Sequence, residues 1–214
     1  AGDKSQLFAV LADSGHVPES VVVDTEGLAS VLAQRCGKRP QWMRPHHFGA
    51  SSGTGALAID DPEKGLAWAC LNPQVQSWQV ADLLSGRNIA VTMLYMRGHL
   101  HRLAMYERLE YFMAHVSPSG ITGNISKGRL FYESGIAAQA QGIIRTVEAA
   151  AGELADGLIT IDAIVEGDER VVVTEVNMRP TACISAYAIA GYDIASDWVA
   201  MTLGQDLGPD SHGV

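Results

Sequence analysis

The sequence has few cysteines and no long apolar run, and each absence excludes a class of protein. Its three cysteines, Cys36, Cys70 and Cys183, are far apart in 214 residues and match neither a disulfide framework nor a zinc-binding pattern. We therefore expect free, buried thiols in a reducing compartment. No apolar run approaches the roughly 20 residues of a membrane span, and no signal peptide is found. The sequence thus predicts a cytoplasmic protein without a membrane partner.

An excess of positive charge is also missing, because the formal net charge is −9. This balance argues against nucleic acid or an anionic membrane as the main partner. A small anionic ligand remains compatible with the negative net charge, since nearby groups and backbone N–H donors determine the electrostatic potential of a binding site more than the net charge does. The hydrophobic fraction of 47% and the charged fraction of 18% are ordinary for one large domain or two small lobes.

Hydrophobic periodicity predicts an α+β fold. Helical patterns cover residues 3–14, 25–36, 62–70, about 136–147 and 184–204. Strand patterns cover residues 20–24, 41–45, 56–60, 77–84, 88–96, 99–107, 158–165 and 170–177. Residues 115–129 are rich in Ser, Gly and Pro and are expected to form a long loop. Because strands outside parallel crossovers predominate, a doubly wound dinucleotide-binding fold is not expected.

The clearest predicted hairpin joins LITIDAIV to RVVVTEVN through EGDE. A loop of even length would pair Asp162 with Val173, and would put Asp162, Glu175 and Asn177 on one face of the hairpin. Two carboxylates and an amide oxygen are ligands that Mg²⁺ prefers when phosphates supply the others. A loop of odd length would turn Asp162 to the other face. The same acids are also compatible with solvated residues at strand ends.

A glycine-rich stretch, RPHHFGASSGTG, lies between two predicted strands. Glycines without side chains let a loop turn its backbone N–H groups toward phosphate oxygens. Arg44, at the end of the preceding strand, adds a fixed positive charge. The stretch matches neither the P-loop nor the dinucleotide fingerprint. A flexible hairpin loop without a ligand remains the alternative.

The order of these features resembles the ATP-grasp superfamily, most closely the ATP-grasp domains of carbamoyl phosphate synthetase large subunits. MRPHHFGASSGTGALAI resembles the glycine loop of those domains, and TEVNMRP resembles their E-(M/I/V)-N-P-R motif. DKSQLFAVLADSGHVPES resembles the helix and strand that open their nucleotide-binding region. The resemblance covers nearly the whole chain. It implies two α+β subdomains that hold a nucleotide between them, 1–86 with the glycine-rich loop and 87–214 with the metal-binding hairpin.

The resemblance also implies a set of nucleotide-binding residues. Lys4 and Arg44 would contact the phosphates, and the backbone of residues 49–55 would cover them. The segment 79–84 would offer its backbone to adenine. Asn88 stands where the family usually has a ribose-binding glutamate, and would bind a hydroxyl without charge. The full set is Lys4, Arg44, Gly49, Ser51, Ser52, Gly53, Gly55, Gln79, Val80, Ala81, Asp82, Leu83 and Asn88.

For the chemistry, the resemblance implies that Asp162, Glu175 and Asn177 hold Mg²⁺ or Mn²⁺ and that Arg179 stabilises charge on the transferred phosphoryl group. The implied activity is that of an ATP-dependent carboxylate–amine ligase acting on a small-molecule carboxylate and an amine. A non-catalytic or regulatory nucleotide-binding module is the main alternative, and a solute-binding or structural protein is a third. The lobe that precedes this region in the family is absent from the sequence, so a separate lobe or a homo-oligomer is an expected partner.

Overall fold

The computed structural model describes residues 4–46, 55–167 and 169–213, and the chain forms two compact units. The larger unit contains Ala1–Val17, Ser85–Leu109 and Gly128–Val214. The smaller unit contains Pro18–Leu84 and Glu110–Lys127. The subdomain division at residues 86 and 87 remains a prediction, and the structure differs from it by grouping the first 17 residues with the larger unit. Among the described residues, no helix has the length and apolar character that a membrane span requires.

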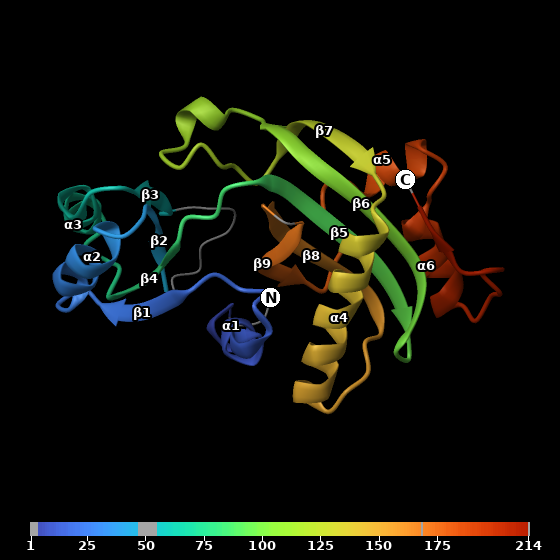
Figure 1. The fold of residues 1–214 in the computed structure, drawn as a ribbon. Helices are drawn as coiled ribbons and strands as arrows, with labels where there is room; N and C mark the ends of the chain where they lie inside the picture. The colour runs from blue at the N-terminus through green and yellow to red at the C-terminus, as the bar shows by residue number, and fades with distance from the viewer. Residues whose placement is uncertain (1–3, 47–54, 168, 214) are drawn as a thin grey trace. The chain divides into compact units, whose positions relative to one another are not determined.

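The smaller unit is built on a four-stranded antiparallel sheet in the order β1-β4-β2-β3 (Figure 1). Its strands are β1 (Ser20–Asp24), β2 (Gln41–Pro45), β3 (Leu57–Ile59) and β4 (Ser77–Asp82). Helices α2 (Leu28–Cys36) and α3 (Pro62–Leu71) and the 3-10 helix η2 (Ala114–Val116) complete the unit. Leu28 and Leu32 of α2 pack with Met43, Trp78 and Val80 of the sheet in a buried core. The expected strands and helices of this region are therefore confirmed.

The larger unit contains a mixed sheet in the order β10-β6-β5-β8-β9, to which β7 adds by pairing with β6. The strands are β5 (Arg87–Met96), β6 (His99–Tyr111), β7 (Ile125–Phe131), β8 (Gly157–Glu166), β9 (Arg170–Asn177) and β10 (Ser211–His212). The helices are α1 (Lys4–Val10), the 3-10 helix η1 (Ala12–Ser14), α4 (Ser134–Ala151), α5 (Ile184–Ile189) and α6 (Ile194–Thr202). β10 runs parallel to β6, whereas the β5–β6, β5–β8 and β8–β9 pairs are antiparallel, so the predicted α+β class with mainly antiparallel strands is confirmed.

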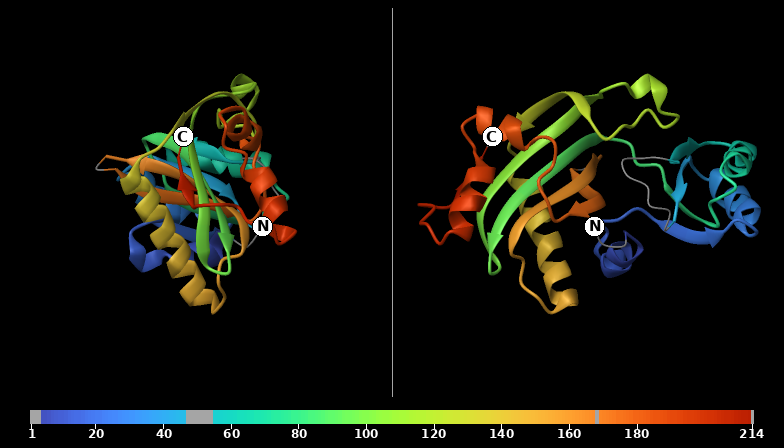
Figure 2. Two further views of the ribbon diagram at one scale, coloured as in Figure 1. Left: turned by 90° about the vertical axis from the view of Figure 1, so that its right-hand side faces the viewer. Right: turned by 180° about the vertical axis from the view of Figure 1, so that it is seen from behind.

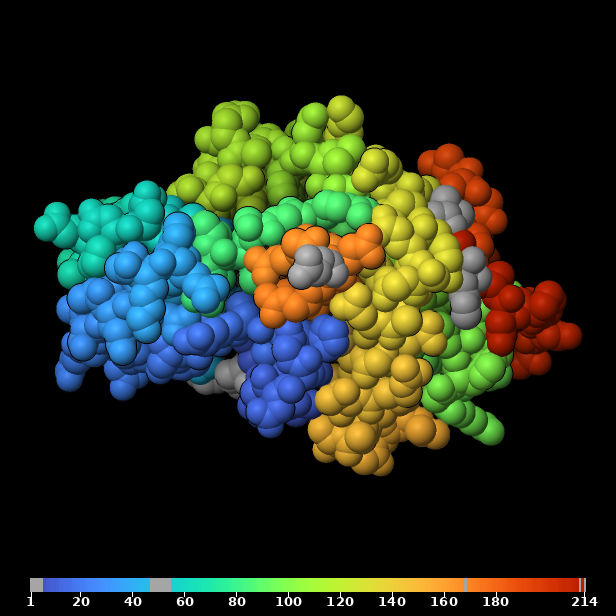
Figure 3. Space-filling view, in the orientation of Figure 1, coloured from blue at the N-terminus to red at the C-terminus, as the bar shows by residue number. Residues whose placement is uncertain are grey.

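One face of this sheet is apolar because every second residue of its strands points to the same side. Helix α4 lies across that face (Figures 1 and 2) and contributes Ile136, Ile143 and Ile144 to the core, with Ile89 and Ile161 facing them. Helix α1 packs beside α4, as the space-filling view shows (Figure 3). Each fully buried aliphatic side chain contributes about 1.5–3 kcal/mol to the free energy of folding. The opposite face carries polar residues such as Thr160 and Asp162 together with buried apolar residues such as Leu94 and Leu158.

Three sequence-based expectations differ from the structure. Residues 115–129 do not form one long loop, because β7 pairs its backbone with β6 from Ile125 onward. The helical pattern over 184–204 is divided into α5 and α6 by Gly191, whose φ of 88° is left-handed and ends a helix at little cost. The cysteines are free as expected, but Cys70 is exposed and Cys36 only half-buried.

Candidate functional site

The polar face of the larger sheet gathers residues from four neighbouring strands. Asn88 on β5 lies opposite Arg108 on β6, and Asp162 on β8 lies opposite Glu175 on β9. Asn177, also on β9, lies opposite the buried Thr160 of β8. We call Asn88, Arg108, Asp162, Glu175 and Asn177 the polar cluster. Four of its five residues are among those that the sequence predicts for the site.

The register of the β8–β9 hairpin differs from the predicted one. Glu166 pairs with Arg170, so the loop is odd, and Ala163 rather than Asp162 faces Val173. A register shift, a β-bulge, follows between Asp162 and Ala163 and leaves Thr174 as the extra residue on β9. The hydroxyl of Thr174 donates to the carbonyl oxygen of Asp162 at 3.1 Å. The predicted pairing of Asp162 with Val173 is therefore wrong, but the bulge still brings Asp162 and Glu175 to one face.

The carboxylate of Asp162 is held by two neighbours within the polar cluster. Nη2 of Arg108 forms an ion pair with Oδ1 of Asp162, and Nδ2 of Asn177 donates to Oδ2 at 3.1 Å. Arg108 also donates from Nη1 to Oδ1 of Asn88 at 2.7 Å and to the carbonyl oxygen of Ile89 at 3.0 Å. The Asp162 and Arg108 side chains are 17% and 11% exposed, so water screens the pair little. Arg108 therefore connects the ribose-site candidate Asn88 with the metal-site candidate Asp162.

The donor set of the polar cluster fits a hard divalent cation. Asp162 and Glu175 supply carboxylate oxygens, and Asn177, which is 4% exposed, supplies an amide. Because the amide nitrogen of Asn177 is used by Asp162, its amide oxygen is the atom left for coordination. Oxygen donors of this kind suit Mg²⁺ or Mn²⁺. The guanidinium of Arg108 supplies one positive charge beside these carboxylates.

Beneath the polar cluster, buried hydroxyls form a floor between the sheet and α5. Oγ1 of Thr92 lies 3.1 Å from Oγ1 of Thr160, and the Tyr187 hydroxyl donates to Thr92 at 3.4 Å. The ring of Tyr106 packs edge-on against Tyr187 and lies 5.1 Å from the guanidinium carbon of Arg108. Burial raises the pKa of both tyrosine hydroxyls, so they stay protonated as donors at neutral pH. This packing holds Arg108 from below.

Arg179 lies two residues beyond the end of β9 and is exposed. Its Nη1 donates to the carbonyl oxygen of Pro180 at 3.2 Å, which is a local contact. We do not count Arg179 in the polar cluster, and its role with a phosphoryl group remains a prediction.

The smaller unit brings together two of the predicted nucleotide-binding residues. Arg44 and Gln79 lie opposite each other on β2 and β4, and Nε of Arg44 donates to Oε1 of Gln79 at 2.8 Å. Gln79 is nearly buried, and its Nε2 lies 3.4 Å from Oγ of Ser20. The contact fixes the guanidinium of Arg44 against the sheet. Its binding of phosphate remains a prediction.

Val80 and Ala81 do not fit the adenine-binding role predicted for the segment 79–84. Both lie on β4, which is the central strand between β1 and β2, and both pair with residues on each side. A central strand has its backbone N–H and C=O groups engaged in the two ladders. These groups are therefore not available to the edge of a base.

The residues at the end of β4 are tied to their own unit. The carboxylate of Asp82 accepts from Arg35 at 2.8 Å and from Arg39 at 2.9 Å, so it closes an ion-pair network with a structural role. The backbone N–H of Leu83 donates to the carbonyl oxygen of Pro40 at 3.0 Å. Within the predicted segment 79–84, contact with a base stays a prediction for the connector that follows β4.

Gly55 is the glycine of the glycine-rich stretch that the structure describes. Its φ of 77° is left-handed, and an added Cβ would lie 2.8 Å from Cγ of Pro45, so glycine is required there. Its carbonyl oxygen accepts from Nε1 of Trp68 at 2.8 Å. The other predicted residues of the stretch, Gly49, Ser51, Ser52 and Gly53, lie outside the described residues, as does the side chain of Lys4.

No protein-family model and no curated protein matches the sequence. Solved structures do match the fold. The D-alanine–D-alanine ligase from Coxiella burnetii aligns with a TM-score of 0.61 over 92% of this chain and 56% of its own. The N5-carboxyaminoimidazole synthetase from Staphylococcus aureus, complexed with ADP, aligns with a TM-score of 0.67 over 99% and 53%. The ATP-grasp ligase PsnB, complexed with a minimal precursor, aligns with a TM-score of 0.61 over 95% and 60%.

Each of these three structures is 16% identical to this sequence, so the likeness concerns the fold. The chain has the ATP-grasp fold, as the resemblance of its motifs predicts. It spans between 53% and 60% of the length of these three proteins.

Proposed function

We propose that this chain is the ATP-binding region of an ATP-dependent ligase that activates a carboxylate as an acyl phosphate for attack by an amine or another nitrogen nucleophile. The observation that carries the proposal is the convergence of Asp162, Glu175 and Asn177 on one face of the β8–β9 hairpin. This convergence occurs in a chain whose fold is that of solved ATP-grasp ligases. The matching synthetase complexed with ADP and a ligase complexed with ATP support ATP as the nucleotide.

Asp162, Glu175 and Asn177 would hold Mg²⁺ or Mn²⁺ through their oxygen atoms. Such an ion, when bound, neutralises phosphate charge during phosphoryl transfer. The residues around it set its position. Arg108 and Asn177 orient the Asp162 carboxylate, and the ring of Tyr106 packs against the guanidinium of Arg108. Orientation before the reaction lowers the entropic cost of reaching the transition state.

The remaining groups of the site would contact the nucleotide and the reacting phosphoryl group. In this proposal, Arg44, Lys4 and the backbone of residues 49–55 bind phosphates. The connector after β4 meets adenine, and Asn88 binds a ribose hydroxyl. Arg179 is exposed, and its hydrogen bond among the described residues is the local one to Pro180, so its guanidinium would move toward charge that grows on the transferred group.

One observation favours a second candidate, a nucleotide-binding module without turnover. The side chain that stands in the ribose position is the neutral Asn88, and its Oδ1 already accepts a hydrogen bond from Arg108 at 2.7 Å. A neutral amide that is already engaged binds a hydroxyl more weakly than a carboxylate does. Such a chain would bind ATP and Mg²⁺ and release no ADP.

A two-stage experiment tests both candidates. The melting temperature is first measured with ATP and Mg²⁺ together, with each alone, and with GTP and Mg²⁺. A rise that requires both ATP and Mg²⁺ supports nucleotide binding, and a flat response would overturn both candidates. ADP release is then measured with pools of amino acids and other small carboxylates and amines. Release that depends on added carboxylate supports the ligase, whereas binding without release from any pool supports the module.

A further inference from the structure

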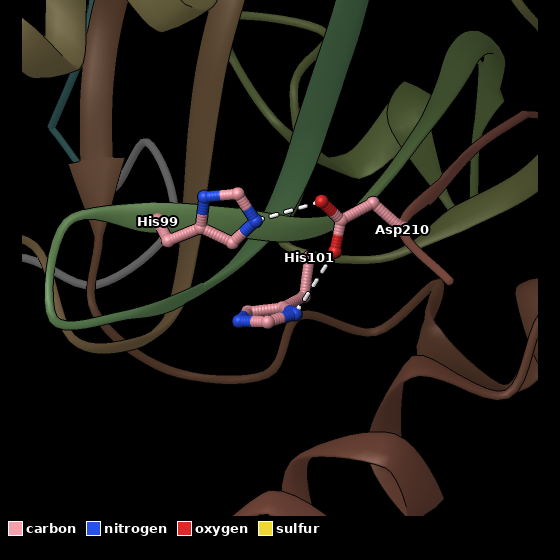
Figure 4. A group of neighbouring side chains, drawn as sticks. All are labelled: His99, His101 and Asp210. Atoms are coloured by element: carbon pink, nitrogen blue, oxygen red, sulfur yellow. Dashed lines mark hydrogen bonds and ion pairs between the residues drawn. The ribbon is translucent and has the colours of Figure 1, made fainter. Parts of the chain in front are cut away.

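Two histidines and an aspartate form a compact group on the larger unit, outside the polar cluster. Nε2 of His99 lies 2.7 Å from Oδ2 of Asp210, and Nδ1 of His101 lies 3.0 Å from Oδ1 of the same carboxylate (Figure 4). One nitrogen or oxygen atom of each residue lies within 4.8 Å of those of the other two. The imidazole rings are close to perpendicular, with centroids 4.6 Å apart. Both rings thus present a nitrogen to one carboxylate.

The sheet fixes the two histidines. They flank the buried Leu100 near the start of β6, directly after the tight turn at Arg97 and Gly98. His101 is only partly exposed, and its Nε2 is buried with no hydrogen bond among the described residues. Nδ1 is therefore the nitrogen that this ring offers to a ligand. His99 is mostly exposed and can adjust its ring.

The position of Asp210 is fixed by backbone contacts on both sides. Arg102 of β6 donates to the carbonyl oxygens of Leu207 and Pro209, which precede the aspartate. Ser211 pairs with Arg102 in the parallel β6–β10 ladder. Nε of Arg102 also donates to Asp197 of α6 at 2.6 Å. The carboxylate is thus brought to the histidines by contacts that do not involve them.

We infer that His99, His101 and Asp210 form a binding site for a divalent transition metal ion of the Zn²⁺ class. Two imidazole nitrogens and one carboxylate oxygen are three ligands of the type found at zinc sites that keep a fourth position for water. Such ions prefer imidazole, whereas Mg²⁺ prefers oxygen alone, so this site and the polar cluster select different metals. Tetrahedral ligands about 2.0–2.1 Å from zinc lie about 3.3 Å apart. The Asp210 carboxylate must therefore withdraw by a few tenths of an ångström from the histidine nitrogens, and ligand atoms that now lie within 4.8 Å of one another must close to that spacing. The mostly exposed His99 ring and the half-exposed Asp210 carboxylate can make this adjustment.

A metal ion at this site would join β6 to the segment that leads into β10. That segment belongs to the C-terminal part of the chain and follows α6. An ion that binds the folded arrangement and not the unfolded chain stabilises the fold by mass action. The inference does not depend on the proposed ligase function.

Calorimetric titration of metal-free, tag-free protein with Zn²⁺ tests the inference. We expect one ion per chain, no competition from excess Mg²⁺, and a visible absorption band of tetrahedral type when Co²⁺ replaces Zn²⁺. His99→Ala and Asp210→Asn should each weaken Zn²⁺ binding by more than the roughly 10–100-fold that loss of an outer-shell partner costs. His99 is largely exposed, so its replacement is compatible with folding.

His115→Ala is the matched control, because His115 is exposed and belongs to the smaller unit. Its Zn²⁺ affinity should equal that of the unmodified chain. Glu175→Gln should also retain Zn²⁺ binding, which separates this site from the polar cluster. Absence of saturable Zn²⁺ binding would overturn the inference. So would Zn²⁺ binding that survives both His99→Ala and Asp210→Asn, or that is lost in Glu175→Gln.

Discussion

Asp162 and Glu175 lie directly opposite each other on β8 and β9, although the loop that joins the strands has an odd number of residues. The odd loop alone would turn them to opposite faces, because side chains alternate along a strand. The bulge at Thr174 adds one residue to β9 and reverses the alternation from there on. Val171 and Val173 consequently face α4, whereas Glu175 and Asn177 face away from it, although all four positions are odd-numbered.

Because of this reversal, Val173 and Glu175 should differ in how far a polar substitution lowers the free energy of unfolding, although they lie two residues apart. Val173→Thr keeps the shape of the side chain but buries a hydroxyl in the apolar core, and should lower the free energy of unfolding by about 1–3 kcal/mol. Glu175→Gln, on the polar face, should change it by less than about 0.5 kcal/mol. Denaturant unfolding of the two variants measures both effects. Equal destabilisation would contradict the assignment of the two positions to different faces.

Much of the fold could be predicted because apolar alternation is a local property of the sequence. Strands such as 20–24 and 41–45 were predicted with the bounds that the structure gives. The bulge could not be predicted, since one extra residue on β9 leaves the pattern of apolar and polar residues almost unchanged. Left-handed backbone at Gly167 and Glu169 sets the odd loop, and Glu169 gives no signal of it in the sequence.

Arg108 and the histidine group lack a clear signal in the sequence, for different reasons. The sequence pattern predicts a strand that ends at residue 107, whereas β6 continues to Tyr111. Arg108 therefore lies one residue outside the predicted strand, although it pairs with Asn88 in the structure. His99 and His101 show the x-H-x-H spacing of a strand, but Asp210 lies 111 residues from His99. A short parallel pairing at the end of the chain has no periodicity that could reveal it.

The cysteines should differ in their reactivity toward an alkylating reagent. Burial raises the pKa of the Cys183 thiol, and also that of Cys36, whereas Cys70 is exposed. The thiolate is the nucleophile, so limited access and a raised pKa both slow the reaction. We expect iodoacetamide to modify Cys70 first and Cys183 last in the native protein, as measured by peptide mass spectrometry over time. Modification of Cys183 at the rate of Cys70 would contradict the burial of Cys183.

Glu175→Gln should reduce ATP-dependent turnover by at least about 100-fold, because a neutral amide replaces a carboxylate that the proposal assigns to the metal. The substitution preserves size, so the melting temperature without ligand should be unchanged. The comparison uses ADP release at saturating ATP and Mg²⁺. Glu153→Gln is the control, since Glu153 is an exposed carboxylate of the same unit and should retain full turnover. Full turnover in Glu175→Gln would remove this residue from the proposed mechanism.

The ion pair between Arg108 and Asp162 allows the strongest test of the polar cluster without any ligand. Arg108→Met leaves the Asp162 carboxylate, which is 17% exposed, without its cation and should lower the free energy of unfolding by about 2–3 kcal/mol. Asp162→Asn replaces this carboxylate by a neutral amide of the same shape. In the double variant, the cost should therefore be smaller than the sum of the two single costs by about 1–2 kcal/mol.

Part of the cost of Arg108→Met should persist in the double variant, because the contacts of Arg108 with the Tyr106 ring and with Asn88 are lost in both. Denaturant unfolding of the four proteins at one pH and one salt concentration gives the coupling energy. Additive costs, within about 0.5 kcal/mol, would mean that solvent screens the pair and that Arg108 does not orient Asp162. A coupling of the expected size would instead mean that the carboxylate is held in place before any cation binds, which is the condition that the proposed metal site requires.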